Sequence, residues 1–418
     1  MLLKNFNVTT KRKISSFNKV IKVDTDKSMS IRSFLIGAIS HNISSATNVL
    51  ESEDVLATIN CLKKLGVKIT RRKSGSYLIF GKGLGSLNAK KGIKLNFGNS
   101  GTLARLLIGI LSTTPNIEVE LRGDHSLNKR SMKKLIELMS QFGALFLPKK
   151  KFTLPLKMVS SNFPIGIKYK AGVSAQLKSA VMLAGLNSYG NTQILETQKS
   201  RNHTENMLLH NKNAITVKKK QTKIINIYGK KFLKPIKIEI PGDPSSAAFF
   251  TALTILNQKS KIKIKNVGLN DTRTGFYRLL KAHGAKINFK NLKRQNNEIR
   301  GDIVVESCKL KSIKAPAKYY VNSTDEYPIL FVIAALTKGK SIFKGIGELA
   351  NKESNRISEM QKVLKQIGIS STASNDQLTI ALKISQRVYV MGRGKIVYSG
   401  TPNELRENEA IRKEWLEV

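Results

Sequence analysis

One short pattern recurs five times along this 418-residue chain: a run of helix-forming residues ends at a glycine or asparagine and continues at once as a short apolar strand. The turn residues, at intervals of roughly 70–85 residues, are Gly66, Gly143, Asn213, Gly284 and Gly368. Either residue type suits such a turn, because a helix commonly ends with one residue in the left-handed conformation, which strains other side chains. The regular spacing predicts a fold built from repeated helix-and-strand units. A sixth copy is expected after residue 368, and the sequence does not contain one.

Length and composition limit the class of protein. A chain of 418 residues is too long for one hydrophobic core and predicts at least two domains. Its longest apolar runs, such as residues 329–336, are too short to span a membrane, and residues 1–13 lack the apolar segment of a secretory signal. Cys61 and Cys308 are the only cysteines, so neither a disulfide framework nor a zinc site is predicted. We expect a cytoplasmic protein with no metal, no cofactor and no membrane partner.

The net charge is strongly positive: 72 basic residues stand against 28 acidic ones, which gives a formal charge of +44. Such a charge invites a nucleic-acid interpretation, because neutralising phosphates releases counterions. However, the lysines are scattered in short clusters, such as residues 149–151 and 218–220, without interleaved aromatic residues. This distribution favours a general compositional bias, with a field that attracts small anionic substrates as the first alternative. We therefore expect no nucleic-acid partner.

Two segments place anion-binding groups at the start of an apolar helix. Residues 26–32 put one lysine and one arginine around a helix start, where unpaired N–H groups and the helix dipole favour an anion. Residues 98–105 combine two glycines with the side-chain donors of Asn99 and Thr102, so this turn could cradle a phosphate or carboxylate. A solvated helix cap and a plain strand-to-helix turn are the respective structural alternatives.

Further chemistry-bearing groups lie in the middle and last thirds of the chain. Residues 174–179 and 200–205 combine hydroxyls with cations, although helix capping by Ser174 and by Thr204 would explain much of this pattern. In residues 352–356 a glutamate lies between a lysine and an arginine, which would leave the carboxylate ionised or poised for proton transfer. Asp325, at another helix start, offers a second carboxylate. Paired carboxylates suit acid and base catalysis, and two ordinary helix caps are the alternative.

Together these segments resemble the EPSP synthase (3-phosphoshikimate 1-carboxyvinyltransferase) family of enolpyruvyl transferases. The matching stretches occur in the family's order and cover roughly residues 18–380. They are Asp26, Lys27 and Ser28 with Arg32; residues 98–102 with Arg105; residues 123–130; residues 174–176 with Lys178; Ser200 and Arg201 with residues 203–205; residues 241–243 with residues 245–248; Asn270 with residues 272–275; Asp325 and Glu326; and residues 352–354 with Arg356.

The resemblance implies an α/β (α+β) fold with two domains of repeated βαβαββ units, in which the last unit is missing or replaced. Residues 25–241 would form the second domain, with three units. Residues 1–24 and 242–380 would form the first domain, which lacks its final unit. A monomer is expected.

The reaction implied is transfer of the enolpyruvyl group from phosphoenolpyruvate to the 5-hydroxyl of shikimate 3-phosphate, with release of phosphate. The implied catalytic residues are Asp325 as base toward the hydroxyl, Glu353 as proton donor or relay, and Lys27, which would touch both substrates. The implied shikimate 3-phosphate contacts are Lys27, Ser28, Arg32, Ser174, Ala175, Gln176, Arg201, Asp325 and Lys352. The implied phosphoenolpyruvate contacts are Lys27, Asn99, Gly101, Thr102, Arg130, Gln176, Lys352 and Arg356. Gly101 matches the family's usual glycine, which implies ordinary sensitivity to glyphosate.

Several positions differ from related patterns. The sister family that acts on UDP-N-acetylglucosamine carries a cysteine in the loop where this chain has Ser126, which argues against that family. Asp24 and Thr25 stand where the resembled family usually has proline and glycine. Asn202 and Asn355 each replace a usual aspartate and remove negative charge beside an arginine.

The resemblance ends after Ile380. The family would continue with an Asp-His-Arg-Ile-Ala-Met-type segment and a late lysine, whereas residues 381–418 resemble the carboxyl end of a branched-chain amino-acid ABC-transporter ATPase. There we expect a strand pair and a short helix capped at Thr401 or Asn403, without nucleotide hydrolysis. Two functions therefore remain open: a transferase with an incomplete catalytic set, or a non-catalytic truncated or fused product that binds shikimate 3-phosphate. A basic nucleic-acid binder is a third, disfavoured class.

Overall fold

A computed structural model describes residues 14–90, 92–219, 221–352, 354–374, 376–382, 388–392, 395–400, 404 and 407–415. The chain divides into two compact units. The first unit comprises residues 1–277, 286–307 and 321–323, and the second comprises residues 278–285, 308–320 and 324–418. The predicted domain boundaries near residues 24 and 241 stay predictions.

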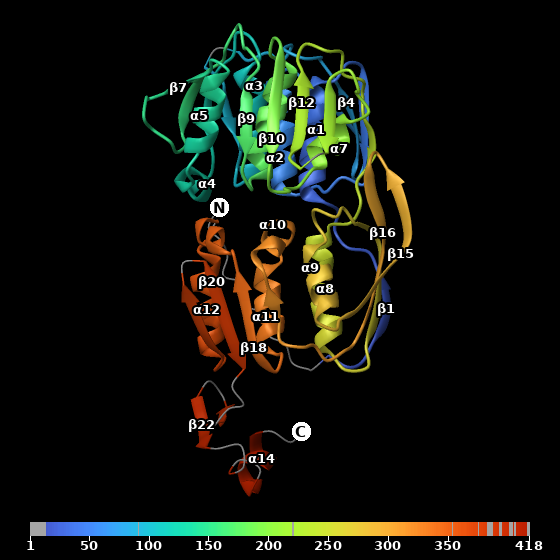
Figure 1. The fold of residues 1–418 in the computed structure, drawn as a ribbon, viewed down its shortest axis with the longest axis vertical. Coiled ribbons are helices and arrows are strands. Elements are labelled where there is room, and N and C mark those ends of the chain that lie inside the picture. The colour runs from blue at the N-terminus through green and yellow to red at the C-terminus, as the bar shows by residue number, and fades with distance from the viewer. Residues whose placement is uncertain are drawn as a thin grey trace. The chain divides into compact units, whose positions relative to one another are not determined.

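The described residues form five four-stranded sheets, and all five have the same strand order. Figure 1 labels β9, β10 and β12, which are neighbours in one of these sheets. In each, two parallel strands lie side by side and the second also pairs with an antiparallel hairpin. The sheets are β13 (Lys237–Glu239), β2 (Ile43–Thr47), β4 (Ser76–Phe80), β3 (Lys68–Lys73); β5 (Lys94–Asn96), β6 (Glu118–Arg122), β8 (Leu156–Val159), β7 (Leu145–Leu147); β9 (Lys168–Ala171), β10 (Asn191–Glu196), β12 (Lys223–Tyr228), β11 (Ile215–Lys219); β1 (Asn18–Ile21), β14 (Lys261–Gly268), β16 (Glu298–Glu306), β15 (Lys286–Gln295); and β17 (Lys314–Ala315), β18 (Gly339–Lys344), β20 (Gln377–Leu382), β19 (Ser370–Ser374). The prediction of repeated βαβαββ units is confirmed.

Two sheets take their first strand from a distant part of the chain. Strand β13 pairs with β2, so that Ile238 lies opposite Ala46, and β1 pairs with β14, so that Val20 lies opposite Lys263. Both exchanged strands are parallel to their neighbours, as in the sheets whose first strand is local. The chain therefore leaves one set of βαβαββ repeats after β1 and returns to that set after β13.

Helices connect the strands within each βαβαββ repeat. Their bounds are α1 (Lys27–Ile39), α2 (Glu53–Lys64), α3 (Gly101–Ser112), α4 (His125–Lys129), α5 (Lys133–Gln141), α6 (Ala175–Leu186), α7 (His203–Leu208), α8 (Pro244–Leu256), α9 (Gly275–Ala282), η1 (Ala317–Tyr319), α10 (Tyr320–Ser323), α11 (Tyr327–Ala335), η2 (Gly347–Asn351), α12 (Arg356–Gln366) and α14 (Glu409–Trp415).

The five predicted helix-to-strand turns are all present, after α2, α5, α7, α9 and α12. Gly66, Gly143, Gly284 and Gly368 have φ values of 81°, 95°, 98° and 76°, so each uses the left-handed conformation that glycine permits. Asn213 is an exception, because its φ is not positive. The expectation of a left-handed asparagine at this turn was therefore wrong.

The third turn is instead held by a side chain. Helix α7 ends early, at Leu208, and the amides of Ala214 and Ile215 both donate to the Asn211 carbonyl oxygen. The Asn211 side-chain oxygen accepts a hydrogen bond of 2.8 Å from the Lys234 amide. A longer loop anchored by a buried asparagine replaces the glycine turn, so no residue there needs a left-handed backbone.

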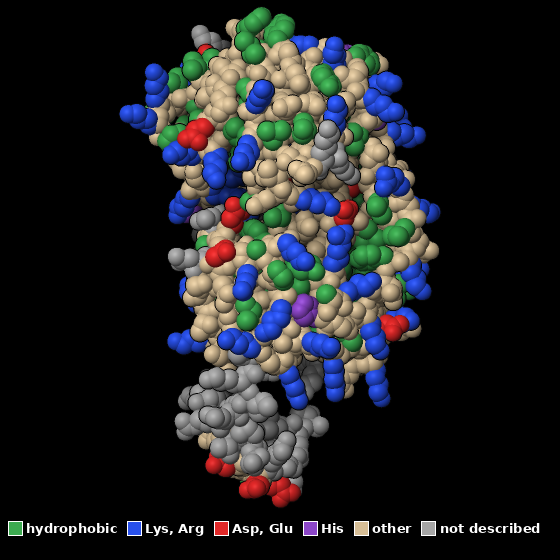
Figure 2. All heavy atoms as spheres, in the orientation of Figure 1, with side chains coloured by type: hydrophobic (Ala, Val, Ile, Leu, Met, Phe, Trp, Pro, Cys, Tyr) green, Lys and Arg blue, Asp and Glu red, His purple; other side chains and the backbone are tan. Residues whose placement is uncertain are grey.

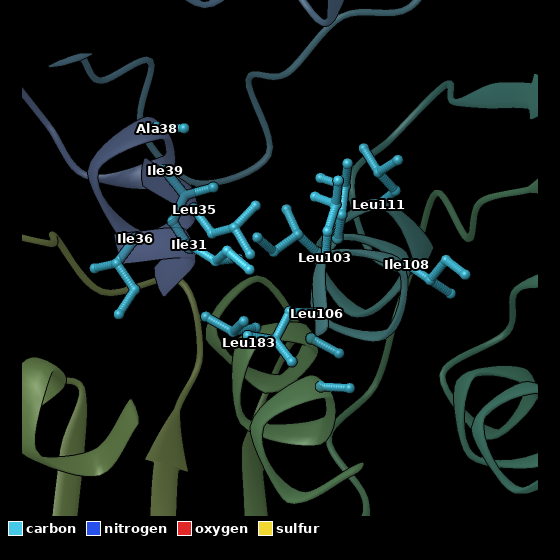
Figure 3. Close-up of a cluster of buried hydrophobic side chains, with 14 of the residues drawn as sticks. Ile31, Leu35, Ile36, Ala38, Ile39, Leu103, Leu106, Ile108, Leu111 and Leu183 are labelled. Atoms are coloured by element: carbon cyan, nitrogen blue, oxygen red, sulfur yellow. The ribbon is translucent and has the colours of Figure 1, made fainter. Parts of the chain in front are cut away.

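The core of the first unit forms where α1, α3 and α6 pack together. Figure 3 shows leucine and isoleucine side chains from these helices converging, among them Ile31, Leu35, Leu103, Leu106 and Leu183. These helices are apolar around most of their circumference, which is the pattern of a helix surrounded by protein. The bodies of these helices are therefore held on most sides, whereas Lys27 at the start of α1 is exposed and Ala175 and Gln176 at the start of α6 are only partly buried.

Helices α8 and α11, in different units, are less fully covered. Phe249 on α8 is 65% exposed, and Val332 on α11 is 43% exposed. Leu106, at the same distance from the start of α3, is completely buried. Each of these helices thus leaves a large apolar side chain exposed. The missing or replaced last unit stays a prediction.

The residues after 382 that are described form a separate strand pair. Strands β21 (Val388–Gly392) and β22 (Lys395–Gly400) are antiparallel, which confirms the predicted pair, and α14 follows. The expected caps Thr401 and Asn403 lie outside the described residues.

Surface features bear on the predicted partners. Among the described residues, no helix is long and apolar enough to cross a membrane. On the face drawn in Figure 2, lysine and arginine side chains are scattered over many elements and do not form a continuous stripe. The side chains on this face are thus spread in the same way as the short lysine clusters of the sequence.

A glycine at the contact of α3 and α6 provides a test of the core. A Cβ on Gly109 would lie 2.6 Å from the Ala180 carbonyl oxygen and 2.9 Å from its Cα. Alanine favours a helix by about 1 kcal/mol, but forcing two backbones apart costs on the order of 1–3 kcal/mol. We expect Gly109→Ala to lower the free energy of unfolding, measured by urea titration.

Gly172→Ala is the matched control, because its Cβ would meet no atom within 4 Å and its φ is not positive. It should change stability by less than about 0.5 kcal/mol. Equal unfolding midpoints for the two variants would contradict the close packing of α3 on α6.

Candidate functional site

Three helices of the first unit begin at the predicted motifs. Each is preceded by a residue whose side-chain oxygen accepts a backbone N–H: Asp26 accepts from Met29 at 2.8 Å, Ser100 from Leu103 at 3.2 Å, and Ser174 from Leu177 at 3.4 Å. These caps satisfy only part of the first turn, so further N–H groups remain available to a ligand. Together with the helix dipoles, they favour an anion at the starts of α1, α3 and α6.

The starts of α3 and α6 are joined directly. Gln176 Nε2 donates a 2.9 Å hydrogen bond to Thr102 Oγ1. A Cβ on Gly101 would lie 2.7 Å from Arg105 Nη1 and 2.8 Å from Arg130 Nη1, so both guanidinium groups lie against this glycine. The structure thus brings together the predicted Gly101, Thr102, Arg130 and Gln176, while the predicted Asn99 lies exposed in the same turn.

A second group joins α1 to α6 and α7. Arg32 is 4% exposed, and it donates to Thr204 Oγ1 at 2.9 Å, to Ser179 Oγ at 3.4 Å and to the Ser28 carbonyl oxygen at 3.0 Å. Burial lowers the pKa of Arg32 to about 10, so the side chain is still a cation at neutral pH. Arg201 contributes to this lowering, which places its charge within electrostatic reach of Arg32.

Thr204 does not cap a helix, and the predicted capping role was wrong. Helix α7 begins at His203 after Asn202, whose side chain makes no cap hydrogen bond. Thr204 lies inside the helix, where its hydroxyl contacts Arg32 and, at 2.8 Å, Ser179. Its role is to link three elements behind the site, which a local pattern does not reveal.

Lys27, at the first position of α1, has a half-exposed side chain. Its Nζ lies 3.0 Å from Asp54 Oδ2 on α2. Ion pairs at such exposed positions contribute little free energy. An anionic ligand could therefore replace Asp54 as the partner of Lys27 at small cost.

A cluster whose contacts the sequence did not predict lies directly behind the start of α1. Arg273, 3% exposed, places Nη2 2.9 Å from Asp243 Oδ1 and 2.8 Å from Ser245 Oγ, and Nη1 3.5 Å from Asp26 Oδ2. Burial alone would raise the pKa of Asp26, but Arg273 and other neighbours lower it overall. The pKa of Asp243 is raised by its burial and by Asp26.

The backbone segments that carry these aspartates also pair with each other. The Asp26 amide donates to the Pro241 carbonyl oxygen at 2.9 Å, and the Asp243 amide donates to that of Asp24 at 2.8 Å. Thr25 and Gly242 form an antiparallel bridge between them. The residue that caps α1 is therefore fixed by both its backbone and its side chain.

The second unit brings two other predicted residues together. Arg356 Nη1, at the start of α12, lies 3.7 Å from Asp325 Oδ1, which precedes α11. The Asn355 side-chain oxygen caps α12 by accepting a hydrogen bond from the Ser358 amide at 3.1 Å. The asparagine can therefore cap the helix at the position where the family usually has aspartate. The predicted Lys352 is half-buried after η2, and Glu353 lies outside the described residues.

The site residues of the first unit thus form two linked groups. One surrounds the starts of α3 and α6, and the other joins α1, α6 and α7. Both offer cations, hydroxyls and helix N–H groups, which together suit polyanionic ligands with phosphate or carboxylate groups.

Comparison with known proteins gives a consistent result. The model of the family described as EPSP synthase (3-phosphoshikimate 1-carboxyvinyltransferase) matches residues 11–391. The 3-phosphoshikimate 1-carboxyvinyltransferase of Paramagnetospirillum magneticum is 39% identical over 361 residues, which cover 86% of this chain and 80% of that protein. The structure of EPSP synthase from Acinetobacter baumannii superposes with a TM-score of 0.76 at 36% identity, covering 92% of this chain and 83% of that one.

A more distant structure shares the fold alone. The enolpyruvyl transferase NikO from Streptomyces tendae superposes with a TM-score of 0.65 at 11% identity, covering 88% of this chain and 82% of that one.

The Arg273 cluster predicts a pH-dependent stability. Replacing Arg273 by methionine leaves Asp26 and Asp243 buried without their cation, which should cost on the order of 3–5 kcal/mol near pH 7. The loss should raise the folded-state pKa of Asp26 above the ordinary value of 3.8, and should raise further the pKa of Asp243, which already lies above that value. The penalty relative to the parent is then complete above the raised values and shrinks as pH falls below them, down to the lowered pKa of Asp26 in the parent.

Unfolding of Arg273→Met and the parent chain should therefore be compared by urea titration between pH 7 and pH 3.5. The exposed Arg72→Met is the control, and should match the parent at every pH. A stability difference that stayed constant down to the lowest pH would contradict the charge balance described for the cluster.

Proposed function

The chain belongs to the EPSP synthase (3-phosphoshikimate 1-carboxyvinyltransferase) family, and we propose that it transfers the enolpyruvyl group of phosphoenolpyruvate to the 5-hydroxyl of shikimate 3-phosphate. The observation that carries the proposal is the match over residues 11–391, combined with the gathering of the motif residues at three helix starts. Both substrates are multiply anionic, as such helix starts favour.

Shikimate 3-phosphate would be held by the group around α1, α6 and α7. Its phosphate suits the first turn of α6 beside the Arg201 cation, because N–H donors and a guanidinium both bind phosphate oxygens. The proposed contacts are Lys27, Ser28, Arg32, Ser174, Ala175, Gln176, Arg201, Asp325 and Lys352.

Phosphoenolpyruvate would be held by the group around α3. The guanidinium of Arg130 lies against Gly101, so a phosphate placed over this first turn would meet N–H donors and a fixed cation together. The proposed contacts are Lys27, Asn99, Gly101, Thr102, Arg130, Gln176, Lys352 and Arg356.

Chemistry would proceed by addition and elimination. The oxygen of the 5-hydroxyl bonds to C2 of phosphoenolpyruvate while Asp325 accepts the proton of that hydroxyl. In the same addition, C3 gains a proton by way of Glu353. C3 then loses a proton and the C2–O bond to phosphate breaks, which restores the double bond. Fixed cations, Lys27 among them, orient the two anions and stabilise the charge that develops.

The domain organisation is part of the same proposal. We propose that residues 25–241 form one domain and residues 1–24 and 242–380 the other, with residues 381–418 as a tail. The paired crossing segments around Thr25 and Gly242 support this division. A cytoplasmic monomer without nucleic-acid or membrane partners, and an ABC-ATPase origin of the tail, stay predictions.

A phosphate-release assay tests the function. Phosphate should appear only when both substrates are present, and Asp325→Asn should lower kcat on the order of 10²–10⁴-fold, because a general base contributes that much. Asp271→Asn, at an exposed aspartate, is the control and should retain the parent rate.

The assay also decides between the two functions left open by the sequence. The alternative is a non-catalytic protein that binds shikimate 3-phosphate. Binding of that ligand by the parent chain without any phosphate release would establish this alternative and refute the transferase.

Gly101 gives a separate test of the phosphoenolpyruvate site. The Cβ of Gly101→Ala would press on two guanidinium groups, so we expect the KM for phosphoenolpyruvate to rise about tenfold, equivalent to about 1.4 kcal/mol. The KM for shikimate 3-phosphate should change much less. Glyphosate should inhibit the parent chain, and indifference to glyphosate at concentrations well above the phosphoenolpyruvate KM would contradict the predicted sensitivity.

A further inference from the structure

Two lysines and two glutamates form a quartet behind the α6–α7 side of the site, in which Lys178, Glu196 and Glu205 are buried and Lys223 is partly exposed. Lys178 on α6 is fully buried, with Nζ 2.6 Å from Glu196 Oε1 at the end of β10 and 2.7 Å from Glu205 Oε1 on α7. Lys223 at the start of β12 places Nζ 2.8 Å from Glu196 Oε2 and 3.1 Å from Glu205 Oε1. Each carboxylate therefore lies between two ammonium groups, and four elements meet at one point.

The quartet is balanced in formal charge. Burial favours the neutral form of Glu196, but Lys178, Lys223 and Ser200 lower its pKa to about 2. Burial likewise disfavours the charged form of Lys223, yet Glu205 and Glu196 raise its pKa. Removing one member would leave a buried charge without compensation, whereas removing one of each sign would restore the balance.

Three members of the quartet lie close to residues of the site. Glu196 Oε1 accepts hydrogen bonds from the Ser200 amide at 3.0 Å and from its hydroxyl at 2.6 Å, which fixes the loop immediately before Arg201. Glu205 follows Thr204, whose hydroxyl contacts Arg32. Lys178 lies one helical turn after the start of α6.

We propose that Lys178, Glu196, Glu205 and Lys223 are positioning residues for the phosphate-binding part of the site. They do not touch the substrate. They hold the Arg201 loop at a set distance from the first turn of α6, so that the guanidinium and the helix N–H groups can bind the same anion. The inference rests on the proposed function, because it takes shikimate 3-phosphate as that anion.

Calorimetric binding of shikimate 3-phosphate to the full chain provides the test. Lys178→Met should raise the Kd about tenfold or more, because two buried carboxylates then share one lysine and draw the Ser200 loop out of place. Glu205→Gln should also raise the Kd, by about threefold or more, through the opposite imbalance. The double variant Lys178→Met with Glu205→Gln should bind more tightly than Lys178→Met, since such neighbouring sites are not additive.

Lys199→Met is the matched control, because it makes the same substitution at an exposed lysine in the same loop. Its Kd should equal that of the parent chain. Circular dichroism and urea unfolding of each variant separate binding from stability; if Lys178→Met does not fold, Glu205→Gln and the double variant carry the test.

Folded single variants that bind as tightly as the parent would overturn the inference, even if they unfold more easily, because they would show a purely structural quartet. A double variant that binds no better than the weaker single variant would overturn it as well. A parent chain that does not bind shikimate 3-phosphate would instead overturn the proposed function, and the inference with it.

Discussion

The buried guanidinium of Arg273 is the contact on which the start of α1 depends. It lies against Asp243, and against Asp26, which in turn caps the helix that carries Lys27, Ser28 and Arg32. Burying three charges is costly, and the arrangement is stable because opposite charges and hydrogen bonds compensate each other. The same cluster joins two chain segments that are more than two hundred residues apart.

The other helix starts depend on the packing of apolar helices. Because α1, α3 and α6 are buried around most of their circumference, their first turns cannot move independently. Polar side chains then adjust the distances between them: Gln176 joins α6 to α3, and Thr204 joins α7 to Arg32 on α1. Rigid helices bring the N–H donors, and longer side chains bring the cations, so the proposed site needs little reorganisation to bind an anion.

Local features could be predicted from the sequence, and long-range ones could not. The capping role of Ser174 and the left-handed Gly66, Gly143, Gly284 and Gly368 follow from neighbouring residues alone, and these predictions were right. Asn213 and Thr204 were misinterpreted, because a buried asparagine and a distant arginine decide their roles. Asp26, Asp243 and Arg273 all lie in stretches that carry the family resemblance, but nothing in the sequence shows that their side chains meet. Resemblance to a family identified most candidate site residues without explaining what holds them.

The central claim is that anion-binding helix starts, fixed from behind by buried charges, form the substrate site. A crystal structure of the chain with shikimate 3-phosphate tests this claim most directly. The account predicts phosphate oxygens within about 3 Å of the first-turn donors of α6 and of the Arg201 guanidinium. A phosphate bound elsewhere, with the α6 start and Arg201 unoccupied by the ligand, would contradict it.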